Sequence, residues 1–168
     1  MTACPDSAGS YHPWTTYIHA REEARRRGDR KVGTEHLLLG LLHEKDVASM
    51  LGIGLQSARD ALGALDREAL GALGISPALD APPLPMRHTP ARPTLKAVLT
   101  DRLPLTPAAK RALAEAGKPV RRGRRITARR VLLRLLDLRA PDPAAVLLAA
   151  LGVDRATVCG QLDPPPAA

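Results

Sequence analysis

The sequence contains no phenylalanine, and aromatic residues make up only 2% of its 168 residues. Any hydrophobic core therefore has to be built from leucine, alanine, valine and isoleucine, within a hydrophobic content of 45%. Leucine and alanine favour helices, whereas the β-branched residues that favour strands are sparse. The composition predicts an all-α fold, with enough residues for one domain with a substantial core.

Cysteine is also scarce. Cys4 and Cys159 stand at opposite ends of the chain, and no Cys/His pattern has the spacing of zinc ligands. We therefore expect no disulfide framework, no metal site and no cofactor. The longest apolar stretches are too short to cross a bilayer, and the N-terminus lacks the basic and apolar regions of a secretory signal. These absences predict a soluble, cytoplasmic protein without membrane contact.

Motifs that carry chemistry are missing as well. The sequence has no GxxxxGK[ST] phosphate loop, so it contains no ATPase module of that type. No Ser/His/Asp or Cys/His constellation can be assembled from its residues. The sequence therefore predicts a protein that is not an enzyme.

What the chain does have is helical periodicity, interrupted by residues that start or end helices. Helix starts are expected at Thr15 or Thr16, Thr34, Asp46, Thr106, Asp142 and Asp154, and helix ends at Gly28, Gly52, Gly74, Gly117 and Gly152. Glu22 and Glu23 precede Arg26 and Arg27 by four residues, which predicts ion pairs along the first helix. The expected organisation is one compact domain with a flexible N-terminus (1–14), a first helical unit (15–75), a Pro-rich linker (76–104), a second helical unit (105–163) and a tail (164–168).

The two helical units have similar sequences. VGTEHLLLGLL in the first corresponds to ITARRVLLRLL in the second, so that Val32 matches Ile126 and Leu38 matches Leu132. Further along, Leu51-Gly52 matches Leu151-Gly152. A single unit of this kind cannot bury its apolar faces alone, so two should pack as a pseudo-twofold pair. We expect about eight helices in two related groups of four.

These motifs resemble the Clp repeat, found in the N-terminal domain of the ClpA- and ClpC-type AAA+ unfoldases. The resemblance rests on EARRRG, VGTEHLLLGLL and the later LG in the first unit, and on LPLTPAAKRAL at the start of the second. It extends over about residues 15–163. It implies an eight-helix domain that docks substrates and adaptors for an unfoldase feeding a protease. Without ATPase modules, such a chain would act as an adaptor or as a decoy in Clp proteolysis.

The resemblance also implies a binding site. In the ClpC branch the domain is similar to a reader of phosphoarginine, in which an acidic residue holds the guanidinium and backbone N–H groups of the preceding turn hold the phosphate. On this chain the acid is Glu35 and the turn is Val32, Gly33 and Thr34. A helix N-terminus suits an anion, and a carboxylate suits a guanidinium. The alternative is structural: a favourable first-turn acid beside a buried His36 that ties the turn down.

The second unit departs from that pattern, because Arg129 and Arg130 stand where the family has Glu and His. A second guanidinium site of the same type is therefore not expected. The net charge of +8 and a pI near 10.3 leave room for acidic partners. The candidate phosphate or acidic-partner contacts are Arg121, Arg122, Arg124, Arg125, Arg129 and Arg130.

Two interpretations of this arginine cluster stay open: a surface for nucleic acid or acidic protein, and a solvated loop and helix start in an arginine-rich chain. Scarce aromatic residues argue against single-strand binding. The favoured partners are proteins or peptides, meaning Clp substrates, adaptors or unfoldase components. A basic nucleic-acid-associated or regulatory protein is the alternative function.

Overall fold

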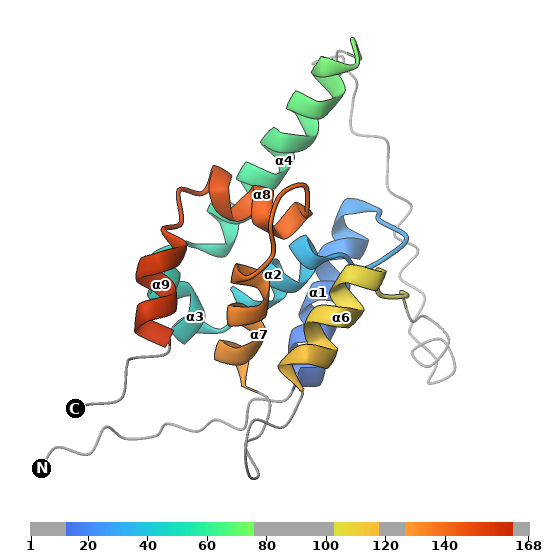
Figure 1. The fold of residues 1–168 in the computed structure, drawn as a ribbon. Coiled ribbons are helices and arrows are strands. Elements are labelled where there is room, and N and C mark those ends of the chain that lie inside the picture. Colours follow the sequence, from blue (N-terminus) through green and yellow to red (C-terminus); the bar gives the residue numbers. More distant parts are fainter. Residues whose placement is uncertain (1–12, 76–102, 118–126, 163–168) are drawn as a thin grey trace, which may run out of the picture.

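The structure is a computed structural model that describes residues 13–75, 103–117 and 127–162 (Figure 1). Within these ranges it contains eight α-helices and no strand beyond one isolated bridge, so the all-α prediction is confirmed. The helices are α1 (Pro13–Arg27), α2 (Thr34–Leu41), α3 (Lys45–Leu51), α4 (Leu55–Ala72), α6 (Pro107–Ala116), α7 (Ala128–Leu136), α8 (Pro143–Ala150) and α9 (Arg155–Leu162).

The helices fall into a first unit, α1–α4, and a second unit, α6–α9. Figure 1 shows α2 in the middle of the bundle, with α1 and α6 on one side and α3 and α9 on the other. The distal part of α4 projects away from the body. α2 packs against α1, α4, α6, α7 and α8, so one short helix of the first unit joins both units.

The core is aliphatic, as the composition requires. In α2 every side chain except that of Glu35 is buried, which is typical of a central helix that is apolar on all sides. The predicted leucine stripes lie in this core with exposed fractions of 4% or less: Leu37, Leu38, Leu41 and Leu42 in the first unit, and Val131, Leu132, Leu135 and Leu136 in the second.

Most predicted helix boundaries are found where they were expected. Thr106 accepts a hydrogen bond from the Ala109 N–H at 3.3 Å, and Asp142 accepts one from the Ala144 N–H at 3.0 Å. Asp154 does the same for the Ala156 N–H at 3.1 Å. Gly28, Gly52, Gly74 and Gly152 all have φ between 65° and 80°, the left-handed conformation that ends a helix at low cost for glycine.

Three boundary predictions were wrong. α1 begins at Pro13, so neither Thr15 nor Thr16 is its cap. α3 begins at Lys45 after Glu44, which places Asp46 in the first turn. Thr34 is the first residue of α2 and not its cap, because Gly33 occupies the cap position. The predicted termini and most of the Pro-rich linker lie outside the described residues.

A glycine sets the contact between α1 and α2. A Cβ on Gly40 would lie 2.7 Å from the Thr16 carbonyl oxygen and 2.8 Å from the Ala20 nitrogen, both backbone atoms. The two helices therefore approach each other as closely as only glycine permits at this position. In the second unit the residue that corresponds to Gly40 is Arg134, which also stands two positions after the matched leucine, Leu132. The glycine is therefore not shared by the two units.

Candidate functional site

The predicted site lies in the turn between α1 and α2, which is joined to the start of the second unit. The Val32 N–H donates to the Pro104 carbonyl at 2.9 Å, and the Thr106 N–H donates to the Val32 carbonyl at 2.9 Å. Val32 is fully buried by this bridge. The turn is thus held by residues from both units, just before α6 begins.

His36 ties the turn down, in agreement with the structural interpretation of this residue. Its ring is 1% exposed. Nδ1 accepts a hydrogen bond from the Gly33 N–H at 3.0 Å, and Nε2 lies 3.0 Å from Asp29 Oδ2. This is the reach-back half of a capping box, in which the third helical residue satisfies the N–H of the cap residue, while Gly33 itself has no side chain to accept from the first N–H groups of α2.

The Glu35 carboxylate folds back over the turn towards Gly33. Its side chain is 16% exposed, and Oε1 lies 3.0 Å from His36 Nδ1. A Cβ on Gly33 would collide with this carboxylate, so glycine makes the arrangement sterically feasible. The other oxygen, Oε2, is buried without a hydrogen-bond partner in the described part of the chain.

The electrostatic surroundings favour the charged form of Glu35. Burial raises the pKa of this carboxyl, but the hydrogen bond with His36, the residue's own backbone N–H and the charge of His36 together bring the pKa below its ordinary value. In the Nε2–H tautomer His36 accepts from Gly33, and a proton on Nδ1 would instead be donated to Glu35. The two residues therefore form one coupled unit at the start of α2.

Thr34 points into the contact between the two units. Its hydroxyl donates to Asp142 Oδ1 at 2.7 Å and accepts from the Ala144 N–H at 3.4 Å. With an exposed fraction of 1%, it contributes to the start of α8 instead of capping its own helix. No feature of the local sequence connects two positions 108 residues apart.

This geometry differs from the phosphate cradle that the resemblance implies. Of the three turn residues, Val32 has already donated its N–H to Pro104 and Gly33 has donated its N–H to His36. All three, Thr34 included, are buried. At the helix start the Glu35 N–H is itself hydrogen-bonded to the carboxylate of the same residue. Glu35 lies beside the turn as predicted, but its carboxylate covers the turn at Gly33.

The arginine cluster is only partly described, since Arg121, Arg122, Arg124 and Arg125 lie outside the described ranges. Arg129 Nη2 donates to the Gln161 carbonyl at 2.9 Å and to the Leu162 carbonyl at 3.5 Å. It therefore satisfies carbonyl groups at the end of α9, a favourable place for a cation. The Arg130 N–H is held by the Thr127 hydroxyl at 3.4 Å.

The first unit also contains a buried polar cluster that was not predicted from the sequence. Glu23 is 3% exposed and accepts a hydrogen bond from Arg59 Nε at 2.9 Å, while His43 Nε2 lies 3.1 Å from its Oε1. His19 stacks on His43 with ring centroids 4.2 Å apart. Glu23 thus pairs across helices and not with Arg27, which instead binds Asp29 and Asp66. The available signal was the position of Glu23 on the same helix face as Ala20.

Burial and ion pairing shift the pKa of Glu23 in opposite directions. Burial raises the pKa of its carboxyl, but the hydrogen bonds from Arg59 and His43, together with their charges, bring the pKa below its ordinary value. The carboxylate therefore stays charged inside the bundle and joins α1 to α4.

Among the described residues, no group of three or more His, Cys, Asp or Glu side chains is arranged to hold a metal ion. In that same part no single helix is long and apolar enough to cross a membrane; α8 and α9 reach the length only together, bent by 105°. No protein-family model and no curated protein matches the chain.

Proposed function

We propose that this chain is a non-catalytic peptide-docking module of the Clp N-terminal type, which captures proteins bound for degradation or their adaptors. The observation that carries the proposal is the doubled motif pattern over residues 15–163, with VGTEHLLLGLL and LPLTPAAKRAL in the expected order. Four helices followed by four helices, with matched glycine ends after α3 and α8, support it. As an adaptor or a decoy, the module acts on an unfoldase carried by another chain.

At the molecular level, Glu35 is proposed to accept the guanidinium of an arginine or phosphoarginine side chain. Its Oε2 makes no hydrogen bond in the described part of the chain, so a forked guanidinium adds bonds without breaking any at that atom. The side chain has to turn outward from Gly33, which also uncovers the N–H groups of Thr34 and Glu35 for an anion. The N–H groups of Val32 and Gly33 take no part.

A binding measurement tests this role. Fluorescence anisotropy would compare three versions of one labelled peptide, carrying phosphoarginine, arginine or neutral citrulline, on the wild type and on Glu35→Gln. We expect the charged peptides to bind and Glu35→Gln to weaken them by about tenfold, the loss of one charge-assisted contact. Glu22→Gln, an exposed acid on α1 whose side chain is 56% exposed, is the matched control.

Two outcomes would count against the proposal. Equal binding to the wild type and Glu35→Gln, with both variants folded by circular dichroism, removes the Glu35 site. If the purified chain neither accelerates nor slows degradation of an arginine-phosphorylated substrate by a Clp unfoldase and protease, the adaptor and decoy roles fail.

A further inference from the structure

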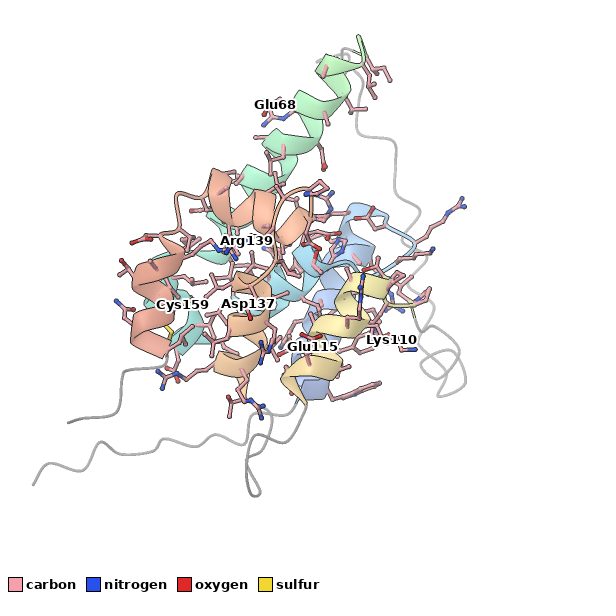
Figure 2. All side chains as sticks on the ribbon, in the orientation of Figure 1. Glu68, Lys110, Glu115, Asp137, Arg139 and Cys159 are labelled. Atoms are coloured by element: carbon pink, nitrogen blue, oxygen red, sulfur yellow. The ribbon has the colours of Figure 1, made fainter. Side chains whose placement is uncertain are left out.

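The second unit contains an open groove where the first unit is filled. The groove has a volume of about 560 Å³, within the usual range of ligand clefts, and lies between α6 and the end of α7. Its apolar lining comes from Ala108, Ala112, Leu138 and Pro141. Figure 2 places Glu115 of α6 on the same face as Asp137 and Arg139, which follow α7.

The matched region of the first unit is closed by its own side chains. Counting back from the glycines that follow α1 and α6, Gly28 and Gly117, Glu23 corresponds to Ala112 and His19 corresponds to Ala108. In the first unit, Glu23 and His19 belong to the cluster with Arg59 and His43, and α1 touches α2 at Gly40. In the second unit alanines replace both polar side chains, so no described side chain at these two positions fills the space.

The rim of the groove carries three arginines, of which one is in an ion pair and two are not. Arg134 is bound to Asp137 at 2.9 Å. Arg111 on α6 and Arg139 after α7 make no ion pair or hydrogen bond within the described residues, and both side chains are exposed. Two forked donors on opposite sides of a groove are therefore available for carboxylates.

Three carboxylates, those of Glu115, Asp137 and Asp142, face the three arginines of the lining, so its formal charges balance. What distinguishes the lining is that two of the arginines have no ion pair within the described residues. Asp137 is neutralised by Arg134, and Asp142 is engaged by the Thr34 hydroxyl and the Ala144 N–H. Glu115 is the one carboxylate of the lining without a partner in the described part of the chain. A ligand that bears only negative charge would bind more tightly if this carboxylate were neutral.

We propose that this groove docks an acidic segment of a partner protein, with carboxylates bound by Arg111 and Arg139 and the backbone lying over the alanine floor. The first unit contains the intramolecular version of the contact, a glutamate carboxylate held by the Arg59 guanidinium. The alanine floor beside the arginines suits a polypeptide, which can cover apolar surface as well as supply carboxylates. This site does not depend on the Clp resemblance and is separate from Glu35.

The test is anisotropy with a labelled ten-residue alternating Glu-Ala peptide on the full chain. Arg111→Glu with Arg139→Glu should weaken binding by about tenfold or more. Lys45→Glu with Arg155→Glu, on α3 and α9 at the other side of the bundle, makes the same change in net charge and should leave affinity within about twofold. Ala108→Glu, which places a carboxylate in the groove, should also weaken binding, and Glu115→Gln should strengthen it.

Further arms distinguish the alternatives. A Gln-Ala peptide of the same length should not bind, and a duplex DNA of twenty base pairs should bind no more tightly than the acidic peptide. Equal losses in the groove variant and in the α3/α9 control would overturn the proposal, because the attraction would then be general. So would weaker binding by Glu115→Gln, or duplex DNA that binds more tightly and depends on Arg111 and Arg139.

Discussion

The two helical units start their central helices at matched positions and hold them differently. In the second unit the Thr127 hydroxyl caps α7 by accepting from the Arg130 N–H. In the first unit the matched residue is Gly33, which has no side chain to cap α2, and the buried His36 ring instead accepts from the Gly33 N–H. A side-chain cap leaves the turn self-contained, whereas a glycine cap makes room for the Glu35 carboxylate. The same fold therefore holds its two matched turns with different groups.

The grooves beside the first helices differ in the same way. The first unit fills its groove with Glu23, held by Arg59 and His43, and with a close helix contact at Gly40. The second unit has Ala112 and Arg134 at the matched positions and leaves a cleft open. The first unit therefore pairs its buried carboxylate internally, whereas Arg111 and Arg139 of the second unit have no ion pair within the described residues.

Removing the buried Glu23 carboxylate from the first unit should have the largest effect on stability. Glu23→Ala is expected to lower the free energy of unfolding by about 3 kcal/mol, because it leaves Arg59 and His43 without their buried partner. Urea unfolding followed by circular dichroism measures the loss. Glu22→Ala on the exposed face is the control and should change stability by less than about 0.5 kcal/mol. A Glu23→Ala protein as stable as the control would mean that the cluster is not a structural element.

The second largest loss of stability is expected from a substitution at Gly40. Gly40→Ala is expected to destabilise the protein by about 2 kcal/mol, since the new methyl group meets backbone atoms of α1 that cannot rotate away. Gly63→Ala is the matched control, because nothing lies within 4 Å of a Cβ at that position of α4. It should stabilise the helix by about 1 kcal/mol. Thermal unfolding of the two variants should therefore move in opposite directions, and a shift in the same direction would contradict the close approach.

The two threonines provide a smaller test of where each turn is anchored. Thr34→Val and Thr127→Val should each cost about 1 kcal/mol, through loss of the Asp142 bond and of the α7 cap respectively. Hydrogen exchange separates them. Thr34→Val should speed exchange at the start of α8, in the other unit, whereas Thr127→Val should affect the start of α7 alone. Identical exchange patterns would remove the distinction between the turns.

The smallest effect concerns pH. The pKa of Glu23 is lower in the folded protein than in the unfolded chain, so its contribution is present above about pH 4.3 and is lost as the pH falls through the folded-state pKa. The stability difference between the wild type and Glu23→Gln should therefore shrink as unfolding is measured from about pH 7 to about pH 3. A difference that stays constant over this range would mean that Glu23 is not charged in the folded state.

The sequence by itself determined the fold class, the leucine stripes of the core and most helix ends. These are local properties: side-chain spacing fixes which helix face is apolar, and glycine, threonine and aspartate act on the backbone within four residues. The position of Glu35 at a helix start and the buried structural role of His36 followed from the same local pattern.

Tertiary structure alone decided which polar groups meet. Thr34 joins Asp142, Glu23 joins Arg59, and Arg129 joins the end of α9, at sequence separations from 32 to 108 residues. A burial pattern does not specify such pairings, because the partner is chosen by how whole helices pack. Packing also closed one groove and opened the other, since that outcome depends on side chains from several helices and not on any single motif.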